Sequence, residues 1–265
     1  MDRANHKGKT ALITGASGGI GLELARLFAR DGFGLALVAR SGDKLAQIRE
    51  EFERRYNVTV HTLPKDLADP AAPDELFNEM KERSIGIDAL VNNAGFTVFG
   101  PFVATDYAKE RDLMQVNIVA LTHLTKLFLP GMVERGWGRV LNVASTAAFM
   151  PGPLMAVYYA SKAYVLSFSE ALAVELRGTG VSVTALCPGP TETGFQKRGE
   201  MEDSRLVAGR RLMSARAVAR IGYQAMMKGQ DMVVPGFSNW LTAQFPRFLP
   251  HRLAAAIISR AQERV

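Results

Sequence analysis

The sequence predicts a doubly wound α/β fold, in which a parallel sheet of about seven strands is covered by helices on both faces. Short apolar runs alternate with amphipathic helical stretches along the whole chain. The runs are continuously apolar, as in strands that are buried on both faces. No linker, repeat or low-complexity segment interrupts this order, and 48% of the residues are hydrophobic. We therefore expect one domain over residues 1–265.

The predicted elements follow one another regularly. Strands are expected at Thr10–Thr14, Leu35–Ala39, Val58–Leu63, Ile87–Val91, Arg139–Val143, Val181–Leu186 and Met232–Val234. Helices are expected at Leu22–Arg30, Lys44–Tyr56, Pro73–Arg83, Thr105–Glu134 (ending near Pro130-Gly131), Tyr158–Arg177 and Ala215–Lys228. In such a sheet, ligands bind at the carboxyl ends of the strands.

Composition excludes several classes of protein. A single cysteine, Cys187, rules out a disulfide framework and a cysteine-based metal site, and the four histidines are scattered, so no metal is expected. The net charge of +6 suits an anionic cofactor, and no pattern typical of nucleic-acid binding accompanies it. The polar start, Met1 to Lys9, has no apolar core of a signal peptide. We expect a cytoplasmic location.

A glycine-rich loop joins the first strand to the first helix. Its small residues let the backbone approach a pyrophosphate, and the helix that follows offers free N–H groups to the anion. After a first strand, this loop predicts a Rossmann-type dinucleotide site. The residues expected to bind are Gly15, Ser17, Gly18, Gly19, Ile20 and Gly21.

Cofactor preference is expected to depend on the end of the second strand. Where NAD-binding folds usually carry an acid, the sequence has Ala39-Arg40-Ser41, so Arg40 and Ser41 point to NADP(H) over NAD(H). The alternative is that Arg40 is a solvated loop residue. Asp66, with Leu67, either contacts the adenine or caps the next helix.

Two further strand ends are expected to face the cofactor. The sequence Asn92–Gly95 ends the fourth strand, and Asn93, Ala94 and Gly95 are placed close to the bound nucleotide, although an ordinary turn is the alternative. The sixth strand runs into a Pro-Gly loop.

A serine, a tyrosine and a lysine carry the predicted chemistry. Tyr158 follows Ser145 by thirteen residues, and Lys162 lies one helical turn further on. Residues i and i+4 share one face of a helix, so the phenol and the ammonium lie side by side. The cation is expected to lower the pKa of the Tyr158 phenol and prepare it for acid–base catalysis.

These motifs resemble those of the short-chain dehydrogenase/reductase family over essentially the full chain. The matching patterns are T-G-x-x-x-G-x-G at Thr14–Gly21, N-N-A-G at Asn92–Gly95, N-V-A-S at Asn142–Ser145, Y-x-x-x-K at Tyr158–Lys162 and P-G-x-x-x-T at Pro188–Thr193. Ala144 stands where many members have a second serine.

The resemblance implies a role for each matching residue. Ser145 polarises a carbonyl, Tyr158 delivers the proton, and Lys162 holds the nicotinamide ribose. Asn117 matches the fourth catalytic residue, which positions a water. The residues implied to line the nicotinamide are Pro188, Gly189, Thr191 and Thr193. The family also implies a homodimer or homotetramer.

The substrate is expected to be a lipophilic ketone, because the loop Thr146–Ala156 is apolar. Its apolar residues are Ala147, Ala148, Phe149, Met150, Leu154 and Met155, and Phe96 and Phe195 are expected to extend this wall. The stretches Leu129–Ser145 and Pro151–Lys162 resemble the branch of the family that contains 3-oxoacyl reductases and hydroxysteroid dehydrogenases, and this resemblance implies a 3-oxoacyl compound, thioesters included. The alternative functions are a 3-oxoacyl carrier-protein reductase and an NADP-sensing regulator.

A lid over about residues 190–214 and a tail over about 236–265 complete the chain. The lid is basic through Lys197, Arg198, Arg205, Arg210, Arg211 and neighbouring arginines. Three interpretations of the tail stay open: packing over the substrate cleft or a subunit interface, peripheral contact with an anionic membrane, or reception of an acidic substrate carrier by the basic lid.

Overall fold

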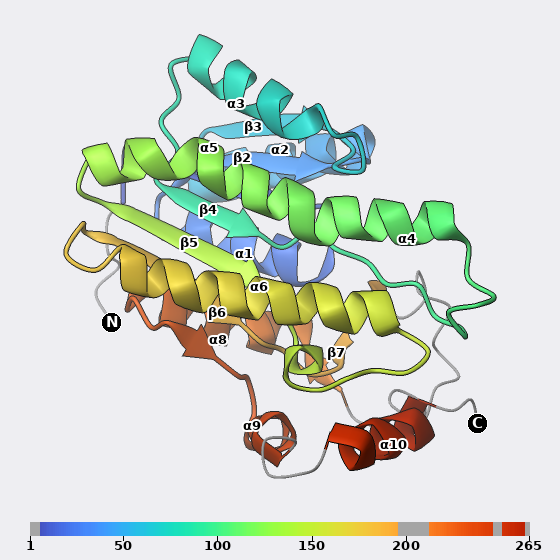
Figure 1. The fold of residues 1–265 in the computed structure, drawn as a ribbon. Coiled ribbons are helices and arrows are strands. Elements are labelled where there is room, and N and C mark those ends of the chain that lie inside the picture. The colour runs from blue at the N-terminus through green and yellow to red at the C-terminus, as the bar shows by residue number, and fades with distance from the viewer. Residues whose placement is uncertain (1–5, 196–211, 246–250, 263–265) are drawn as a thin grey trace.

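A seven-stranded parallel sheet forms the centre of the molecule (Figure 1). The computed structural model describes residues 6–195, 212–245 and 251–262. The strands lie in the order β3-β2-β1-β4-β5-β6-β9. Their bounds are β1 Thr10–Thr14, β2 Gly34–Ala39, β3 Val60–Pro64, β4 Ala89–Asn92, β5 Gly138–Val143, β6 Val181–Leu186 and β9 Met232–Val233. The predicted doubly wound fold is therefore confirmed, with each strand within two residues of its expected bounds.

The order of the strands reverses between β1 and β4, which are neighbours in the sheet. From β1 the chain proceeds outwards to β2 and β3, and then returns to β4 on the other side. Such a switch point leaves a crevice at the carboxyl ends of the strands, since the loops on its two sides diverge. The glycine-rich loop after β1 and the Asn-Asn-Ala-Gly loop after β4 both lie at this edge.

Two layers of helices cover the sheet. One layer is α1 Gly19–Arg30, α2 Gly42–Tyr56 and α8 Ala215–Met227, and the other is α3 Ala72–Glu82, α5 Leu121–Glu134 and α6 Ala156–Glu175. Figure 1 shows α3, α5 and α6 in front of the sheet, with α1 and α8 behind it. Successive strand residues serve opposite layers: Ile13 packs in the α1 layer and Leu12 in the α6 layer.

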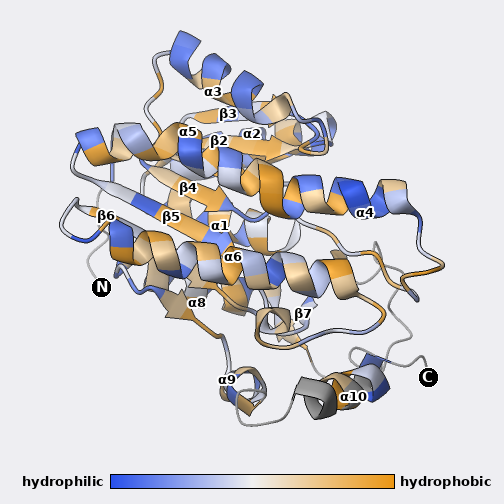
Figure 2. Cartoon of the chain, viewed as in Figure 1, coloured by the Kyte–Doolittle hydropathy of each residue, from blue (hydrophilic) through white to orange (hydrophobic). Residues whose placement is uncertain are grey.

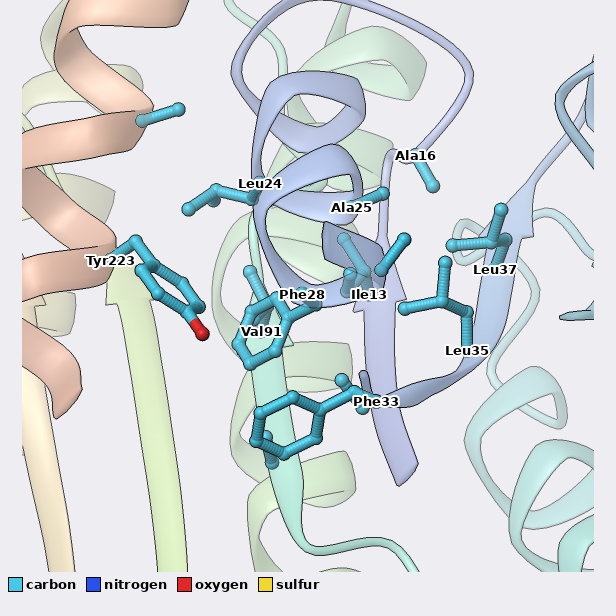
Figure 3. Close-up of a cluster of buried hydrophobic side chains, with 14 of the residues drawn as sticks. Ile13, Ala16, Leu24, Ala25, Phe28, Phe33, Leu35, Leu37, Val91 and Tyr223 are labelled. Carbon is cyan, nitrogen blue, oxygen red and sulfur yellow. The ribbon is translucent and has the colours of Figure 1, made fainter. Parts of the chain in front are cut away.

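The core on the α1 side is shown in Figure 3. Ile13, Leu35 and Leu37 of the strands belong to one hydrophobic cluster with Leu24 and Phe28 of α1, and each of the five is fully buried. Phe28 also meets the ring of Tyr223 from α8 edge-on, with 4.9 Å between the ring centroids. The Tyr223 hydroxyl donates to Asp31 Oδ2 at 2.9 Å, so the buried phenol is hydrogen-bonded. Figure 2 shows the same layering, with hydrophobic strands and hydrophilic outer faces on α3.

The expected long helix Thr105–Glu134 contains three segments. It runs as α4 Tyr107–Met114, a π-helical segment η1 Gln115–Ala120, and α5. The prediction that it ends near Pro130-Gly131 is wrong, because Pro130 lies inside α5 and the helix continues to Glu134. By length and composition Tyr107–Glu134 would suffice for a membrane span, but Leu124 and Phe128 pack into the core beside the sheet. This is typical of a core helix.

Several short elements were not predicted. A 3-10 turn, η2 Thr146–Phe149, precedes α6, and a two-stranded sheet pairs β7 Thr191–Glu192 with β8 Met213–Ser214. The tail forms α9 Phe237–Gln244 and α10 His251–Gln262, which lie apart from the two helical layers (Figure 1). The lid residues Lys197, Arg198, Arg205, Arg210 and Arg211 lie outside the described residues. That residues 1–265 form a single domain stays a prediction.

Candidate active site

The loop between β1 and α1 forms a cradle for a phosphate group. Gly15 has a positive φ of +67°, and a Cβ added there would lie 2.7 Å from Asn93 Nδ2. Asn93 in turn donates from Nδ2 to the carbonyl oxygens of Thr14 at 2.9 Å and Gly15 at 3.3 Å. A side chain on Gly21 would overlap the Gly15 carbonyl. The helix α1 starts at Gly19 with no acidic residue in its first turn, so its free N–H groups and positive end remain available to an anion.

A cavity of about 690 Å³ extends from this cradle along the carboxyl ends of the strands. Most of the predicted site residues line it: Gly15, Ser17, Gly18, Gly19, Ile20, Arg40, Asp66, Leu67, Asn93, Ala94, Gly95, Ser145, Tyr158, Lys162, Pro188, Gly189, Thr191 and Thr193. Gly21, Ser41 and Asn117 are outside this lining. Gly21 instead packs under the Gly15 carbonyl, and Ser41 precedes the first turn of α2. The sequence motifs thus converge on one elongated cavity.

Tyr158 and Lys162 project from the same face of α6 into this cavity. Both are buried, and Lys162 Nζ lies 5.8 Å from the centroid of the Tyr158 ring. The ammonium donates to the carbonyl oxygen of Val143 at 2.8 Å, which ties α6 to the end of β5. Ser145, two residues beyond that carbonyl, is hydrogen-bonded to Tyr158. The serine, phenol and ammonium therefore form one cluster.

Burial dominates the acid–base properties of this cluster. It raises the pKa of the Tyr158 phenol above its usual value, and the hydrogen bond from Ser145 lowers that pKa by less. The expectation that Lys162 brings the pKa of Tyr158 below its usual value is therefore wrong for the chain as described. The same burial lowers the pKa of Lys162 to about 8. In the low-dielectric interior the protonated phenol is the stable form, which is the form that donates a proton.

Asn117 lies in the π-helical segment η1, behind the loop that follows β4. Its Oδ1 accepts from the backbone N–H of Phe96 at 3.2 Å, and its Nδ2 donates to the Phe96 carbonyl at 3.1 Å and to Ser161 Oγ at 3.1 Å. A Cβ on Gly95 would lie 3.0 Å from Asn117 Oδ1 and 3.6 Å from Lys162 Nζ. The π-helical segment thus packs Asn117 against the backbone of Gly95 and Phe96, close to Lys162. The Asn117 side chain does not line the cavity.

Buried amides tie the central strands together below the site. Asn92 Nδ2 donates to Asn142 Oδ1 on the neighbouring strand at 2.9 Å and to Thr125 Oγ1 at 3.0 Å. Asn142 continues the chain of bonds to Ser169 Oγ of α6 at 2.9 Å. The asparagines of this loop thus join neighbouring strands at two places, since Asn93 also bonds the end of β1.

The loop after β6 closes the cavity from the opposite side. The Pro188 carbonyl accepts from Ser145 Oγ at 3.3 Å and from the backbone N–H of Thr146 at 2.9 Å. A Cβ on Gly19 would lie 3.2 Å from the methyl group of Thr193. This loop therefore touches both Ser145 and the glycine-rich cradle, and its place beside a nicotinamide stays a prediction.

Three cations gather at the other end of the cavity, where β2 and β3 end. Arg40 is largely exposed, and its Nη1 lies 3.9 Å from Asp66 Oδ2. Asp66 Oδ1 accepts from the backbone N–H of Ala68 at 3.0 Å, so Asp66 stabilises a turn and does not cap α3. Lys44 and Lys65 also line this end, and neither was predicted. Lys65 pairs with Glu75 at 2.5 Å, which leaves Arg40 and Lys44 as the better placed cations.

The end of the cavity beyond Tyr158 is apolar. Its side chains are Phe96, Ala147, Met150, Met155, Phe195 and Ile258, with Tyr159 among them. Ala148 and Phe149 face a different core cluster, and Leu154 is outside the lining, so the prediction for these three is wrong. Sequence reasoning missed Asn239 and Thr242 of α9 and Ile258 of α10, because the tail carries no motif and reaches the cavity only through tertiary packing.

Comparison with known families leads to the same class of protein as the fold and the cavity described above. A family model described as short chain dehydrogenase matches residues 9–203. The chain belongs to the short-chain dehydrogenase family, which places it among the oxidoreductases. Among the described residues, no three His, Cys, Asp or Glu side chains gather as a metal site requires.

Relatives of known name include several reductases. The chain is 36% identical over 189 residues to the ketoacyl reductase HetN of Nostoc, which covers 71% of this chain and 66% of HetN. It is 35% identical over 185 residues to the human very-long-chain 3-oxoacyl-CoA reductase, covering 68% of this chain and 59% of that protein. It is 39% identical over 186 residues to sulfoacetaldehyde reductase 2 of Chromohalobacter salexigens, covering 69% and 73%. The match thus spans about three fifths to three quarters of these relatives.

Solved structures reproduce the fold along most of the chain. A short-chain dehydrogenase from Sphingobium yanoikuyae, in complex with NADPH, superposes with a TM-score of 0.81 at 31% identity over 90% of this chain and 93% of that one. A 7beta-hydroxysteroid dehydrogenase superposes with a TM-score of 0.85 at 22% identity over 96% and 97%, which supports the fold alone.

Proposed function

We propose that this protein is an NADP(H)-dependent oxidoreductase that interconverts a lipophilic ketone, including 3-oxoacyl compounds, and the corresponding secondary alcohol. The observation that carries the proposal is the cluster of Ser145, Tyr158 and Lys162 between a dinucleotide cradle and an apolar wall. A carbonyl group in this position has a hydrogen-bond donor at its oxygen and apolar surface around its substituents.

The chain's own residues supply the proton chemistry. The substrate oxygen accepts hydrogen bonds from Ser145 and Tyr158, which stabilise the negative charge that develops on it during reduction. A bound nicotinamide cofactor supplies the hydride to the carbonyl carbon. Tyr158 transfers its phenolic proton to the oxygen, so that one hydride and one proton complete the alcohol. Lys162, held by the Val143 carbonyl, lies beside the phenolate that is left and stabilises its charge.

The cofactor is proposed to be NADP(H). Arg40 and Lys44 line the end of the cavity beyond the glycine-rich cradle, and a 2′-phosphate there would gain charge-assisted hydrogen bonds. The carboxylate of Asp66 lies beside Arg40, with Oδ2 at 3.9 Å from Nη1, while its Oδ1 accepts from the Ala68 backbone N–H. The NADPH complex of the Sphingobium relative supports the same choice.

The substrate class follows from the apolar wall. Met150, Met155 and Phe195 offer no charge to a carboxylate or sulfonate near the reacting carbon, so a charged small aldehyde or sugar acid fits poorly. The names of the ketoacyl and 3-oxoacyl-CoA relatives favour an acyl chain. The second candidate is a 3-oxoacyl carrier-protein reductase. An NADP-sensing regulator is disfavoured, because binding alone has no use for the serine, phenol and ammonium cluster.

The tail is proposed to belong to the substrate site. Ile258 of α10 lines the cavity, Gln262 bonds to Tyr159, and α9 contributes Asn239 and Thr242. These contacts favour packing over the cleft among the three interpretations. Its outer face carries exposed Phe237 and Trp240, whose rings stack with centroids 6.0 Å apart, so peripheral membrane contact stays a prediction.

Assembly into a dimer or tetramer is also proposed. Exposed apolar side chains on α5 and α6, namely Val133, Tyr164 and Val174, would be covered by such an interface. The cytoplasmic location stays a prediction.

The experiment that tests the function is a substrate panel. Purified protein is mixed with NADPH and with straight-chain ketones, 3-oxoacyl esters, 3-oxoacyl thioesters, sulfoacetaldehyde and keto sugar acids, and the loss of NADPH absorbance is followed. We expect turnover with the uncharged ketones and 3-oxoacyl compounds. Turnover of only the charged small substrates would contradict the proposal, and Tyr158→Phe serves as the inactive control.

A further inference from the structure

A second phenol, Tyr159, stands in the apolar wall immediately after the catalytic tyrosine. Its ring meets the Tyr158 ring edge-on, with 6.0 Å between the centroids and an interplanar angle of 78°. Both residues line the same cavity. Adjacent helical residues point about 100° apart, so the two phenols approach a bound ligand from different directions. A hydroxyl group in an apolar wall costs free energy unless it is hydrogen-bonded, so its partners need an explanation.

Contacts at the face of its ring and at its hydroxyl group fix the position of Tyr159. On one face, Gly152 lies so close that a Cβ at this position would overlap the Tyr159 ring. At the other end, Gln262 of α10 donates from Nε2 to the Tyr159 hydroxyl at 2.6 Å. Gln262 is fully buried, although it lies 103 residues further along the chain. The last residue of the tail that the structure describes is thus bonded to this hydroxyl oxygen.

This hydrogen bond leaves the phenolic proton of Tyr159 available. A tyrosine hydroxyl both accepts and donates, and here its oxygen accepts from the amide. Burial raises the pKa of Tyr159 to about 12, so the proton stays on the oxygen at neutral pH. Gln262 Oε1 has no hydrogen-bond partner among the residues that the structure describes, and Nε2 is the atom of this amide that faces the phenol. Among these same residues, Gln262 is the side chain bonded to that hydroxyl.

We infer that Tyr159 donates a hydrogen bond to a second carbonyl oxygen of the substrate, so that the site prefers 1,3-dicarbonyl compounds such as 3-oxoacyl esters and thioesters over simple ketones. The reacting carbonyl lies at Ser145 and Tyr158, and the ester or thioester carbonyl, one methylene away, lies at Tyr159. Gln262 acts as a positioning residue that holds the hydroxyl and turns its proton towards the cavity. The inference rests on the proposed function and narrows its substrate class.

The alternative is that Tyr159 and Gln262 only anchor α10 to the body of the protein. A matched pair of substrates separates the two interpretations. Ethyl 3-oxohexanoate and 4-nonanone have the same chain length and the same position of the reacting carbonyl, and only the former has a second carbonyl group. An anchoring role affects both substrates alike, whereas a hydrogen bond to the second carbonyl affects the keto ester alone.

Tyr159→Phe is the first variant, because it keeps the packed ring and removes the hydroxyl. We expect kcat/KM for the keto ester to fall about three- to tenfold, as one neutral hydrogen bond is lost, and that for 4-nonanone to change less than about twofold. Gln262→Met is the second variant, because it keeps the length of the side chain and removes the amide that donates to the Tyr159 hydroxyl. Without that donor the phenolic proton is no longer held towards the cavity, so a selective loss of kcat/KM for the keto ester is expected here too.

The outcomes distinguish the inference from the proposed function. A fall in the ratio of the two kcat/KM values in both variants supports the inference. Reduction of both compounds by the unmodified protein, with a ratio unchanged in either variant, overturns the inference and leaves the proposed function standing. Reduction of neither compound with NADPH overturns the proposed substrate class and the inference together.

Discussion

Removal of the buried ammonium should change how stability depends on pH. Lys162 is 5% exposed, and burial lowers its pKa from the ordinary 10.5 to about 8. A lowered pKa means that the folded chain releases this proton at a lower pH than the unfolded chain. Below about pH 8 the lysine is charged in both states, and the cost of burying the charge is present in full. Between about pH 8 and 10.5 unfolding takes up a proton, so this residue makes the protein more stable as the pH rises.

The magnitude follows from the pKa values. A decrease from 10.5 to about 8 corresponds to about 3 kcal/mol. Lys162→Met removes this cost, and it also removes the hydrogen bond to the Val143 carbonyl, which contributes about 1 kcal/mol. At pH 7 we therefore expect the variant to be more stable than the unmodified protein by about 2 kcal/mol. This advantage should disappear as the pH approaches 10.5.

The assay is urea unfolding without cofactor, followed by tryptophan fluorescence at a fixed protein concentration. Burial also raises the pKa of Cys187, to about 12, which weakens the folded state at high pH. Lys162 itself lowers that pKa, but burial keeps the folded thiol protonated up to about pH 10.5 with or without the lysine, so the effect nearly cancels in the difference between the unfolding free energies of the two proteins. Lys126→Met, at an exposed position of α5, is the matched control and should leave the pH dependence unchanged. A stability difference between Lys162→Met and the unmodified protein that stays constant from about pH 7 to 10.5 would refute the reasoning.

Four other predictions address the site, the core and assembly. Tyr158→Phe should abolish turnover yet retain cofactor binding, measured by NADPH fluorescence, whereas Tyr159→Phe should remain active on simple ketones; similar losses in both would contradict the assignment of the proton donor. Arg40→Ala, and still more Ala39→Asp, should reduce the ratio of kcat/KM for NADPH over NADH, because a charge-assisted pair contributes about 1.5–3 kcal/mol; equal efficiency with both cofactors in the unmodified enzyme would refute this. Phe28→Ala should lower the unfolding free energy by about 3–5 kcal/mol, as its ring is fully buried, and a loss under about 1 kcal/mol would be inconsistent with that packing. Light scattering at micromolar concentration should show a dimer or tetramer, and a monomer would rule out the proposed assembly.

The part of the site that could be predicted is the part held by strand ends. Gly15, Asn93 and Ser145 follow parallel strands of one sheet, and the carboxyl ends of such strands meet by topology, so local motifs sufficed to place them together. Ile258 and Asn239 could not be foreseen, because they reach the cavity through helices that carry no motif.

The effects of burial on individual residues could not be predicted from the sequence either. The pKa of Tyr158 was expected to be low from the nearness of Lys162, but desolvation of the phenol, which depends on the packing around it, determines the direction. Pro130 is a second example. Local propensity predicts that the helix ends near this proline, whereas α5 continues through it to Glu134 because the helix packs on the core.

The π-helical segment in the long helix has a consequence for how this chain tolerates insertions and deletions. Each residue added to or removed from an α-helix rotates everything beyond it by about 100°. The wider turn at Gln115–Ala120 absorbs such a rotation, so that Leu113 before it contacts the group around Tyr158 while Leu124 after it packs beside the sheet. Deleting one residue there would restore a regular helix and at the same time turn one of these side chains away from its partner. A deletion that makes this helix more regular would therefore break either the contact of Leu113 with the apolar wall around Tyr158 or the packing of Leu124 beside the sheet.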